Sequence, residues 1–386
     1  MAKANCLSAK ENRHPLRVCE HVDYPFLFLL LLLLTIGLVM LWSASYAQSE
    51  YDTGYTDSGR YLRKQAACAA IGILAMYCFS RLPAGLWYRL AWPLYGISIL
   101  LLLSVLVVGQ QVNGARRWIN IGGIQFQPSE VAKFTQILLF ARLTRHFGPE
   151  ARTFRYGVLG FGLALLGILV PLALEKHLSA IMLMGMVAVV MMFVAGTRMK
   201  WLLVGAVAAL IFVVVYITFM GYAGDRVTAW LHPELDPGDT GYQILQSLYA
   251  IGSGGLFGLG WGKSRQKYLY LPFQYNDYIF AVCCEELGLM GVLGIIILFS
   301  MLISRGYWIA LRAEDRFSTV LAAGLITLIA VQTILNLGVV TNLLPSTGIA
   351  LPFFSYGGTA LAVNLGEMGI LLSISRQRDR RKIQEA

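Results

Sequence analysis

The chain has 386 residues, of which 57% are hydrophobic and 13% are charged, and its mean hydropathy is +0.63. This composition excludes an ordinary soluble globular domain, in which about a quarter of the residues carry charge. The net charge of +10 is spread along the chain rather than gathered in one patch, so no nucleic-acid partner is expected.

Apolar runs long enough to cross about 30 Å of hydrocarbon recur along the whole chain. Backbone in lipid must satisfy its own hydrogen bonds, so these runs are expected to be helices, and a β-barrel would show short alternating segments instead. The predicted fold class is all-α: a polytopic integral membrane protein with ten transmembrane helices. The expected spans are 24–45, 62–80, 87–108, 129–146, 155–174, 178–196, 199–219, 278–304, 317–343 and 354–375.

The first run follows a basic tail, as a secretory signal would. At 24–45 it is far longer than the roughly 7–15 apolar residues of such a signal. It is therefore interpreted as a retained first span.

The distribution of lysine and arginine orients the bundle. With the N-terminus inside, cytoplasmic segments hold twenty of the 31 Lys and Arg residues, in accord with the positive-inside rule. Residues 1–23 and 376–386 are then cytoplasmic tails of a single membrane domain, 24–375. The connection between the seventh and eighth spans, 220–277, becomes a large extracellular loop of a multi-pass plasma-membrane protein.

Cysteine and histidine spacing indicates no metal centre. The six cysteines and five histidines are scattered, and the cysteines are interpreted as ordinary buried or cytoplasmic residues. No cofactor is evident, and a divalent cation is left open without assigned ligands.

Besides the large loop, two outer segments have distinct sequences. Residues 109–128 are amphipathic and glycine-containing, which predicts a segment lying at the membrane interface, before a helix begins at Pro128. Within the large loop, Gly241–Tyr249 is expected to be a short amphipathic helix. Residues 344–358 contain prolines and glycines between apolar flanks, which predicts a re-entrant segment lining an outward pocket.

The glycine-rich stretch around Gly258 to Ser264 superficially resembles a nucleotide-binding loop. Phe257 occupies the position of the first required glycine, and no strand precedes it. A phosphate loop is therefore rejected, although Lys263, Arg265 and Lys267 remain candidate point charges for a lipid diphosphate.

Ionisable residues inside spans are costly and therefore candidates for function. Glu130 and Lys133 lie three residues apart on one helix face, so they can form a structural ion pair, or Lys133 can contact a lipid phosphate or sugar. Glu285, Glu286 and Glu367 raise the same alternatives. One of the two adjacent glutamates is expected to face inward, and Glu286 is preferred.

Two outer features carry further alternatives. Arg116 and Arg117 run against the positive-inside tendency, so they either anchor in headgroups or bind phosphate with their planar donors. Asp277 stands just before an apolar run, where it is either a helix N-cap or a catalytic carboxylate.

Five blocks of the chain are distinctive in combination: Asn113-Gly-Ala-Arg-Arg-Trp118, Gln127-Pro-Ser-Glu130 with Lys133, Gly241-Tyr-Gln-Ile-Leu-Gln-Ser247, Asp277-Tyr-Ile-Phe-Ala281 with Glu285-Glu-Leu-Gly288, and Pro352-Phe-Phe-Ser-Tyr-Gly-Gly358. Together they resemble the FtsW/RodA/SpoVE (SEDS) family of bacterial cell division, elongation and sporulation proteins. The resemblance covers nearly the whole chain from the first span to Arg376. Residues 367–376 resemble the FtsW/SpoVE branch more than the RodA branch, which favours division.

The resemblance implies a peptidoglycan glycosyltransferase that polymerises lipid II outside the plasma membrane. It places the family's essential aspartate at Asp277, as candidate general base, and it implies a class B penicillin-binding protein as partner, with other division or elongation membrane proteins. The candidate substrate-binding residues are Arg116, Arg117, Lys133, Glu130, Gln243, Ser247, Lys263, Glu286 and Ser355.

The chain departs from the family pattern at several positions, including Phe273, Asn276 and Asn342. Lys176-His177 replaces a frequent Pro-Asp or Pro-His, so no role is transferred to residues 175–177. Two rival functions share the expected cavity and cations: a lipid II flippase, which needs no base, and a non-enzymatic scaffold that recruits division or elongation proteins.

Overall fold

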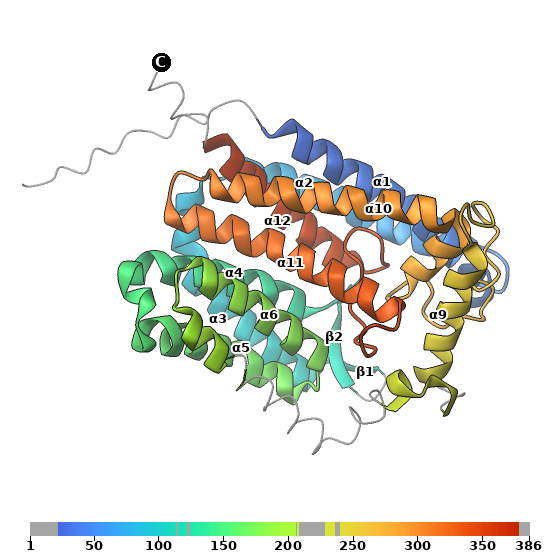
Figure 1. Cartoon of the computed structure of the whole chain (residues 1–386), viewed down its shortest axis with the longest axis horizontal. Coiled ribbons are helices and arrows are strands. Elements are labelled where there is room, and N and C mark those ends of the chain that lie inside the picture. The colour runs from blue at the N-terminus through green and yellow to red at the C-terminus, as the bar shows by residue number, and fades with distance from the viewer. Residues whose placement is uncertain are drawn as a thin grey trace, which may run out of the picture.

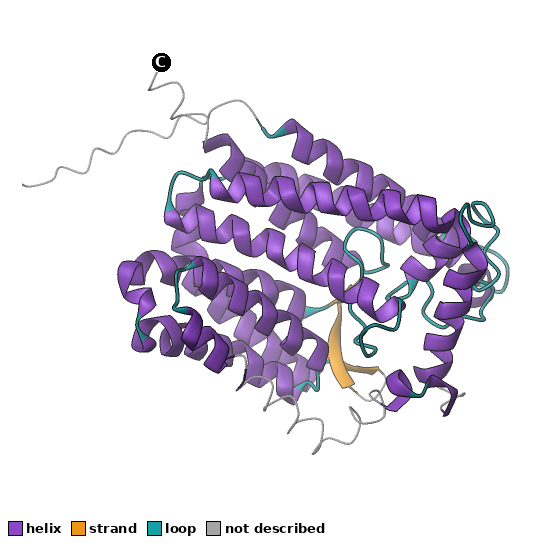
Figure 2. Cartoon of the chain, viewed as in Figure 1, coloured by secondary structure: helices purple, strands orange, loops and turns teal. Residues whose placement is uncertain are grey.

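Helices make up most of the structure, a computed structural model that describes residues 22–112, 115–121, 124–205, 207, 228–235 and 240–377 (Figure 2). The long elements are α1 (Tyr24–Asp52), α2 (Arg60–Arg81), α3 (Ala84–Val108), α4 (Pro128–Phe147), α5 (Phe161–Leu174), α6 (Leu178–Val194), α9 (Thr240–Gly254), α10 (Ile279–Leu311), α11 (Arg316–Val340) and α12 (Gly358–Gln377). The short elements are β1 (Gln110–Val112), β2 (Ala115–Ile121), β3 (Ile124–Phe126), η1 (Gly148–Arg152), η2 (Arg155–Gly160) and η3 (Pro233–Leu235).

The prediction of a polytopic helical membrane protein is confirmed. In the described part of the chain, nine of the ten predicted spans coincide with helices, and most of the tenth, 199–219, lies outside it. Seven of the described helices are long and apolar enough to cross a membrane, and α6 is a shorter apolar helix of 17 residues. The count of ten spans and the cytoplasmic termini stay predictions.

The helices pack into two groups that meet at α11 (Figure 1). In one group α1 lies beside α10 and α2 packs against α12, while α3, α4, α5 and α6 form the other. The apolar window of α11 is 83% buried, the highest fraction among the candidate spans that the structure describes. This helix is therefore the central element against which the site segments are fixed.

The all-α prediction is wrong for the first outer segment. Residues 110–126 contain a three-stranded antiparallel sheet in the order β1-β2-β3, rather than only an interfacial segment. Each strand is short, so its pairing depends on its neighbour and leaves little sequence signal. The sheet connects α3 to α4 and carries Arg116 and Arg117 on β2.

The large loop predicted over 220–277 contains α9, which includes the predicted short helix Gly241–Tyr249 and extends beyond it at both ends. Ser247 Oγ donates to the Val340 carbonyl at 2.9 Å, so α9 is fixed to the end of α11. Residues 220–227 and 236–239 of the loop lie outside the described residues.

A break inside α10 explains the glycine-rich stretch. Gly288 has φ 65° and ψ −174°, which is outside the helical region, so the carbonyl groups before it lose their helical partners. Leu259 N–H donates to the Glu285 carbonyl at 2.9 Å, and Gly260 N–H donates to the Glu286 carbonyl at 3.1 Å. A Cβ at Gly288 would lie 2.2 Å from the backbone nitrogen of Gly258, so this backbone contact requires glycine.

The predicted re-entrant segment is a non-helical connection between α11 and α12. Phe353 and Phe354 are buried, and Gln65 of α2 bonds both the Ser355 carbonyl and the Gly357 N–H at 3.1 Å. Such irregular backbone is tolerated at membrane depth when protein satisfies its polar groups. Ser355 Oγ accepts from Leu351 N–H at 2.8 Å, so this candidate binding residue closes a turn.

Candidate active site

Asp277 lies between the large loop and α10. The helix begins at Ile279 and its N-cap residue is Tyr278, so the interpretation of Asp277 as the N-cap is wrong. Asn336 of α11 donates to the Asp277 carbonyl at 2.7 Å and to the Ile349 carbonyl at 2.8 Å. One amide therefore fixes the backbone of Asp277 to the segment that joins α11 and α12.

The carboxylate of Asp277 is half-buried and faces that connecting segment. A Cβ built on Gly348 would lie 3.7 Å from Asp277 Oδ2. Gly348 has φ 68°, in the left-handed region that favours glycine. The carboxylate thus lies close to a backbone turn without being fully withdrawn from solvent.

Three tyrosine rings lie next to this position. The ring centroids of Tyr61 and Tyr275 are 4.7 Å apart, and Tyr356 lies 5.0 Å from Tyr61. Burial raises the pKa of the Tyr275 hydroxyl, and the charges of Asp52 and Asp277 add to the rise, so the phenol stays neutral. The residue-type pattern gave no sign of this group, because the three tyrosines come from distant parts of the chain.

Glu130 and Lys133 form the predicted ion pair at the start of α4. Lys133 Nζ lies 2.6 Å from Glu130 Oε2, and the two side chains are only 6% and 10% exposed. Glu367 of α12 lies within electrostatic range of both. Both of its carboxyl oxygens are buried, and neither has a hydrogen-bond partner among the described residues.

The two arginines of β2 have different surroundings. Arg116 donates to the Leu106 carbonyl at 3.0 Å and is exposed. Arg117 donates through Nη2 to the Lys176 carbonyl, in the turn between α5 and α6. Arg117 and Lys133 both act electrostatically on His177. Of the two arginines, only Arg117 is therefore directed toward the region of Lys133.

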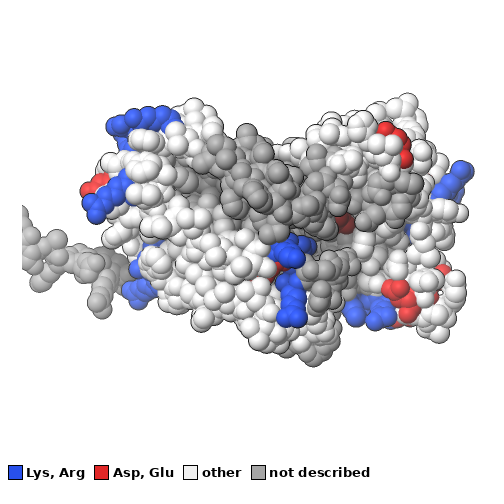
Figure 3. All heavy atoms as spheres, turned by 90° about the horizontal axis from the view of Figure 1, so that it is seen from below, with Lys and Arg blue, Asp and Glu red and all other residues white. Residues whose placement is uncertain are grey.

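The α5–α6 turn is joined in the same way to the segment beside Asp277. Ser179 Oγ donates to the carbonyl of Thr347, the residue before Gly348. A chain of contacts thus links Arg117, the α5–α6 turn and the segment beside Asp277. Seen from below, lysine and arginine side chains lie at several places on this face, and one group near its middle has acidic atoms beside it (Figure 3).

Glu285 and Glu286 lie in a separate cluster. Both are buried, so burial does not distinguish Glu286, the preferred inward-facing residue, from Glu285. Glu286 accepts from Ser43 at 2.6 Å and pairs with Lys267 Nζ at 2.9 Å. Glu285 accepts from the Ser264 hydroxyl and from Arg265 N–H at 3.0 Å. The two carboxylates fix the loop to α1 and α10, so Lys267 is engaged in a buried ion pair.

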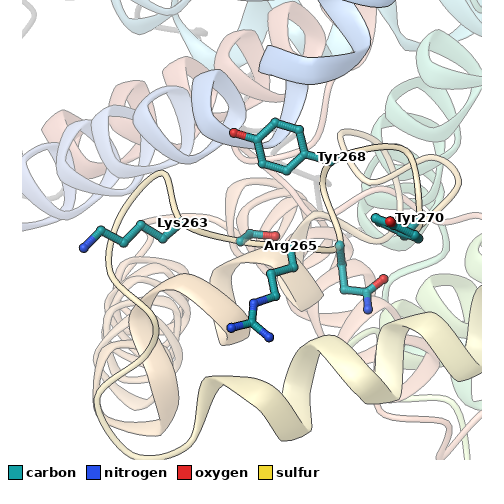
Figure 4. A pocket seen from close by; sticks show the side chains of 6 residues that line it. Lys263, Arg265, Tyr268 and Tyr270 are labelled. Atoms are coloured by element: carbon teal, nitrogen blue, oxygen red, sulfur yellow. The ribbon is translucent and has the colours of Figure 1, made fainter.

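The remaining candidates are dispersed. Exposed Lys263 lines a surface pocket of about 540 Å³ with Ser264, Arg265, Gln266, Tyr268 and Tyr270, and it points in a different direction from Arg265 (Figure 4). None of Asp277, Lys133 and Arg117 lines this pocket. Gln243 is half-buried on α9, and the bonds of Ser247 and Ser355 to backbone groups support the fold.

Comparison with known proteins agrees with this architecture. The model of the cell cycle protein family of FtsW, RodA and SpoVE matches residues 24–380. The chain belongs to this family.

Two relatives are similar over nearly their full lengths. Stage V sporulation protein E of Bacillus subtilis is 40% identical, with 92% of this chain and 97% of that protein covered. The probable peptidoglycan glycosyltransferase FtsW of Trichlorobacter lovleyi is 38% identical, with 94% and 95% covered.

A solved structure extends the likeness to three dimensions. It is described as "Structural coordination of polymerization and crosslinking by a peptidoglycan synthase complex", and one of its chains matches with a TM-score of 0.77 and 31% identity. The match covers 93% of this chain and 99% of that chain. Membership of this family confirms the resemblance from which Asp277 was selected as a candidate. The sequence assigned no role to Glu175 and His177, which the structure places beside Arg117.

Proposed function

We propose that this protein is a peptidoglycan glycosyltransferase that polymerises lipid II into glycan strands on the outer face of the plasma membrane, with Asp277 as general base. Family membership and a relative named as a probable peptidoglycan glycosyltransferase support the activity. The carrying observation is that Asp277, fixed through Asn336, borders the segment to which Ser179 of α6 is bonded, directly after the turn that Arg117 contacts.

The reaction requires few groups. An acceptor 4-hydroxyl attacks the anomeric carbon of the donor, the new glycosidic bond forms, and the bond to undecaprenyl diphosphate breaks. The leaving group is already activated, so the enzyme chiefly supplies a base for the hydroxyl proton and positive charge for the departing diphosphate. A single displacement predicts inversion at the anomeric carbon.

The chain places suitable groups for both tasks. Asp277 is half-buried and therefore reachable by an acceptor, and its backbone is held by a neighbouring helix. Lys133 is buried beside Glu130, and Arg117 reaches the turn next to it. Preorganised cations act more strongly in such a partly dry site than in water.

The outer location and the partner belong to the same proposal. The positive-inside bias of the chain directs the end of the bundle that carries Asp277 outward. A class B penicillin-binding protein is the proposed partner, supported by the match to a chain of a complex that couples polymerisation with crosslinking. The FtsW-type and sporulation-type relatives support a role in division or sporulation.

The test is polymerisation of purified lipid II by the reconstituted protein, with and without its partner transpeptidase. Asp277→Asn should lower the rate by about 10²–10⁴-fold, because a positioned base contributes that much. Asp57→Asn, at an aspartate that pairs with Arg63 between α1 and α2, is the matched control and should retain wild-type rate.

Other outcomes would select the rivals. Glycan polymer made by Asp277→Asn at wild-type rate would remove the base assignment. Wild-type protein that moves lipid II across vesicles without making polymer would identify a flippase. Normal growth of cells carrying only Asp277→Asn would favour a scaffold.

A further inference from the structure

We propose that the turn between α5 and α6 forms, with Arg117, a binding subsite for the diphosphate of the lipid-linked substrate. The inference rests on the proposed function, because it names where that substrate's anionic group binds. The turn residues are Glu175, Lys176 and His177, and His177 is the N-cap residue of α6.

The backbone of the turn is fixed by a Schellman motif at the end of α5. Lys176 N–H donates to the Ala173 carbonyl at 3.1 Å, and His177 N–H donates to the Leu172 carbonyl at 2.9 Å. Lys176 takes the left-handed conformation, with φ 55°. The chain therefore reverses within three residues, and α6 begins directly after the turn.

The beginning of α6 is an uncapped helix N-terminus. His177 makes no side-chain capping bond within the described residues, and the helix continues for 17 residues from Leu178. The first N–H groups of a helix lack intrahelical partners and carry partial positive charge, which favours a bound anion. This feature alone is common to many helices, so the side chains beside it decide the case.

Two buried polar atoms of the turn lack partners. Glu175 is 3% exposed and His177 is 9% exposed. Within the described parts of the chain, neither Glu175 Oε1 nor His177 Nδ1 makes a hydrogen bond. A buried polar atom without a partner costs about 1–3 kcal/mol, so a ligand that bonds these atoms would recover that energy.

The charge at the turn selects an anion. Burial raises the pKa of Glu175 to about 8 even though Arg117 opposes the rise, so the carboxyl is largely protonated at neutral pH. Burial, together with the charges of Arg117 and Lys133, lowers the pKa of His177 to about 3, so the imidazole is neutral. Neither group therefore repels an anion at neutral pH, and both can donate a hydrogen bond to phosphate oxygen.

The other charged groups agree with this assignment. Lys133 of α4 adds a second positive charge, and its ion-pair partner Glu130 and the neighbouring Glu367 belong to the same buried group. Asp277 approaches from the segment that Ser179 contacts through Thr347. A diphosphate in the subsite would thus lie on the same side as the base, as a departing group must.

The experiment measures binding of fluorescent undecaprenyl diphosphate to the full chain in phosphatidylcholine nanodiscs between pH 6.5 and 9.5. Wild-type affinity should fall about tenfold between pH 7 and pH 9, because ionised Glu175 repels the ligand one unit above a pKa of about 8. Glu175→Gln should bind without this alkaline fall, since its amide donor does not ionise. Glu234→Gln, at an exposed glutamate, should keep the wild-type pH profile.

Arg117→Gln supplies a second measurement, and its affinity should drop by about tenfold or more because charge-assisted bonds are lost. An identical alkaline fall in wild type and Glu175→Gln would overturn the subsite. Displacement by phosphatidylglycerol or by inorganic diphosphate at the same concentrations would overturn the assignment to a lipid diphosphate.

A parallel polymerisation assay separates this inference from the proposed function. The wild-type KM for lipid II should rise at alkaline pH, and the KM of Glu175→Gln should not. Polymerisation with identical KM profiles would overturn the subsite and leave the function standing. Absence of polymer at every pH, with the binding profile intact, would remove the function and leave an anion site.

Discussion

The molecule holds two groups of buried charge that are completed in different ways. The first, the loop cluster, contains Glu285, Glu286 and Lys267 with their serine partners, and all four glutamate oxygens accept hydrogen bonds. The second, the site cluster, contains Glu130, Lys133, Glu367, Glu175 and His177. Among the described residues, four polar atoms of Glu367, Glu175 and His177 in this cluster have no partner.

This difference distinguishes buried charged groups that stabilise the fold from buried polar groups that a ligand can complete. A fully bonded network in a low dielectric fixes one backbone arrangement, which suits a loop that must pack against the break in α10 at Gly288. Unpartnered buried atoms carry a cost that a folded protein retains where a ligand completes the bonds. From sequence, the glutamates of the loop cluster and Glu130, Lys133 and Glu367 of the site cluster had the same interpretation, as ionisable residues inside spans.

The largest expected effect on stability comes from a substitution that removes the ion pair of the loop cluster. Lys267→Met should lower the free energy of unfolding by about 3–5 kcal/mol, because it leaves the Glu286 carboxylate buried without its cation. Unfolding in detergent, followed by helical circular dichroism during denaturant titration, measures the change.

Lys263→Met, at an exposed lysine of the same loop, is the matched control and should change stability by less than about 0.5 kcal/mol. Lys267→Met with Glu286→Leu should recover much of the loss, since no buried charge of the pair remains. A loss below about 1 kcal/mol for Lys267→Met would mean that the pair is not structural.

The corresponding substitution in the site cluster should change the free energy of unfolding far less. Glu367→Gln removes no hydrogen bond formed by the described residues, so stability should stay within about 1 kcal/mol of wild type. Polymerisation should fall, because an amide replaces the carboxyl group that lies within electrostatic range of Lys133 and Glu130. The same denaturant titration and the lipid II assay measure both quantities. A loss of 3 kcal/mol or more would show that Glu367 is paired as firmly as Glu286, and the comparison would fail.

Features that depend on residues close together in the chain could be predicted from the sequence. The apolar runs predicted the helices, because lipid demands long continuous apolar segments. The Glu130–Lys133 pair was also predicted, because i,i+3 neighbours on a helix meet whatever the rest of the fold does.

Long-range features were missed. The break at Gly288 lies inside an apolar run, and only its contact with the glycine-rich stretch reveals it. The role of the α5–α6 turn depends on Arg117, whose partner Lys176 lies 59 residues along the chain. Hydropathy and spacing contain no information about such a pairing.

The smallest expected effect concerns the α5–α6 turn. It tests whether the site cluster, unlike the loop cluster, also contains backbone strain. Lys176 and Asn342 occupy equivalent left-handed positions, at φ 55° and 58°, after α5 and α11. Asparagine adopts this conformation readily, whereas lysine is held there at a cost of roughly 1–2 kcal/mol.

Lys176→Gly should therefore raise the free energy of unfolding by about 0.5–1 kcal/mol, since part of the relief is offset by the entropy of glycine in the unfolded chain. Asn342→Gly should give a smaller gain, and Lys176→Ala should give none, because alanine retains the Cβ clash. Denaturant titration of the three variants gives the ranking. Equal stabilities for Lys176→Gly and Lys176→Ala would exclude strain at the turn. A more stable Lys176→Gly variant with weaker diphosphate binding would instead show that the strained turn orients Glu175 and His177 for the ligand.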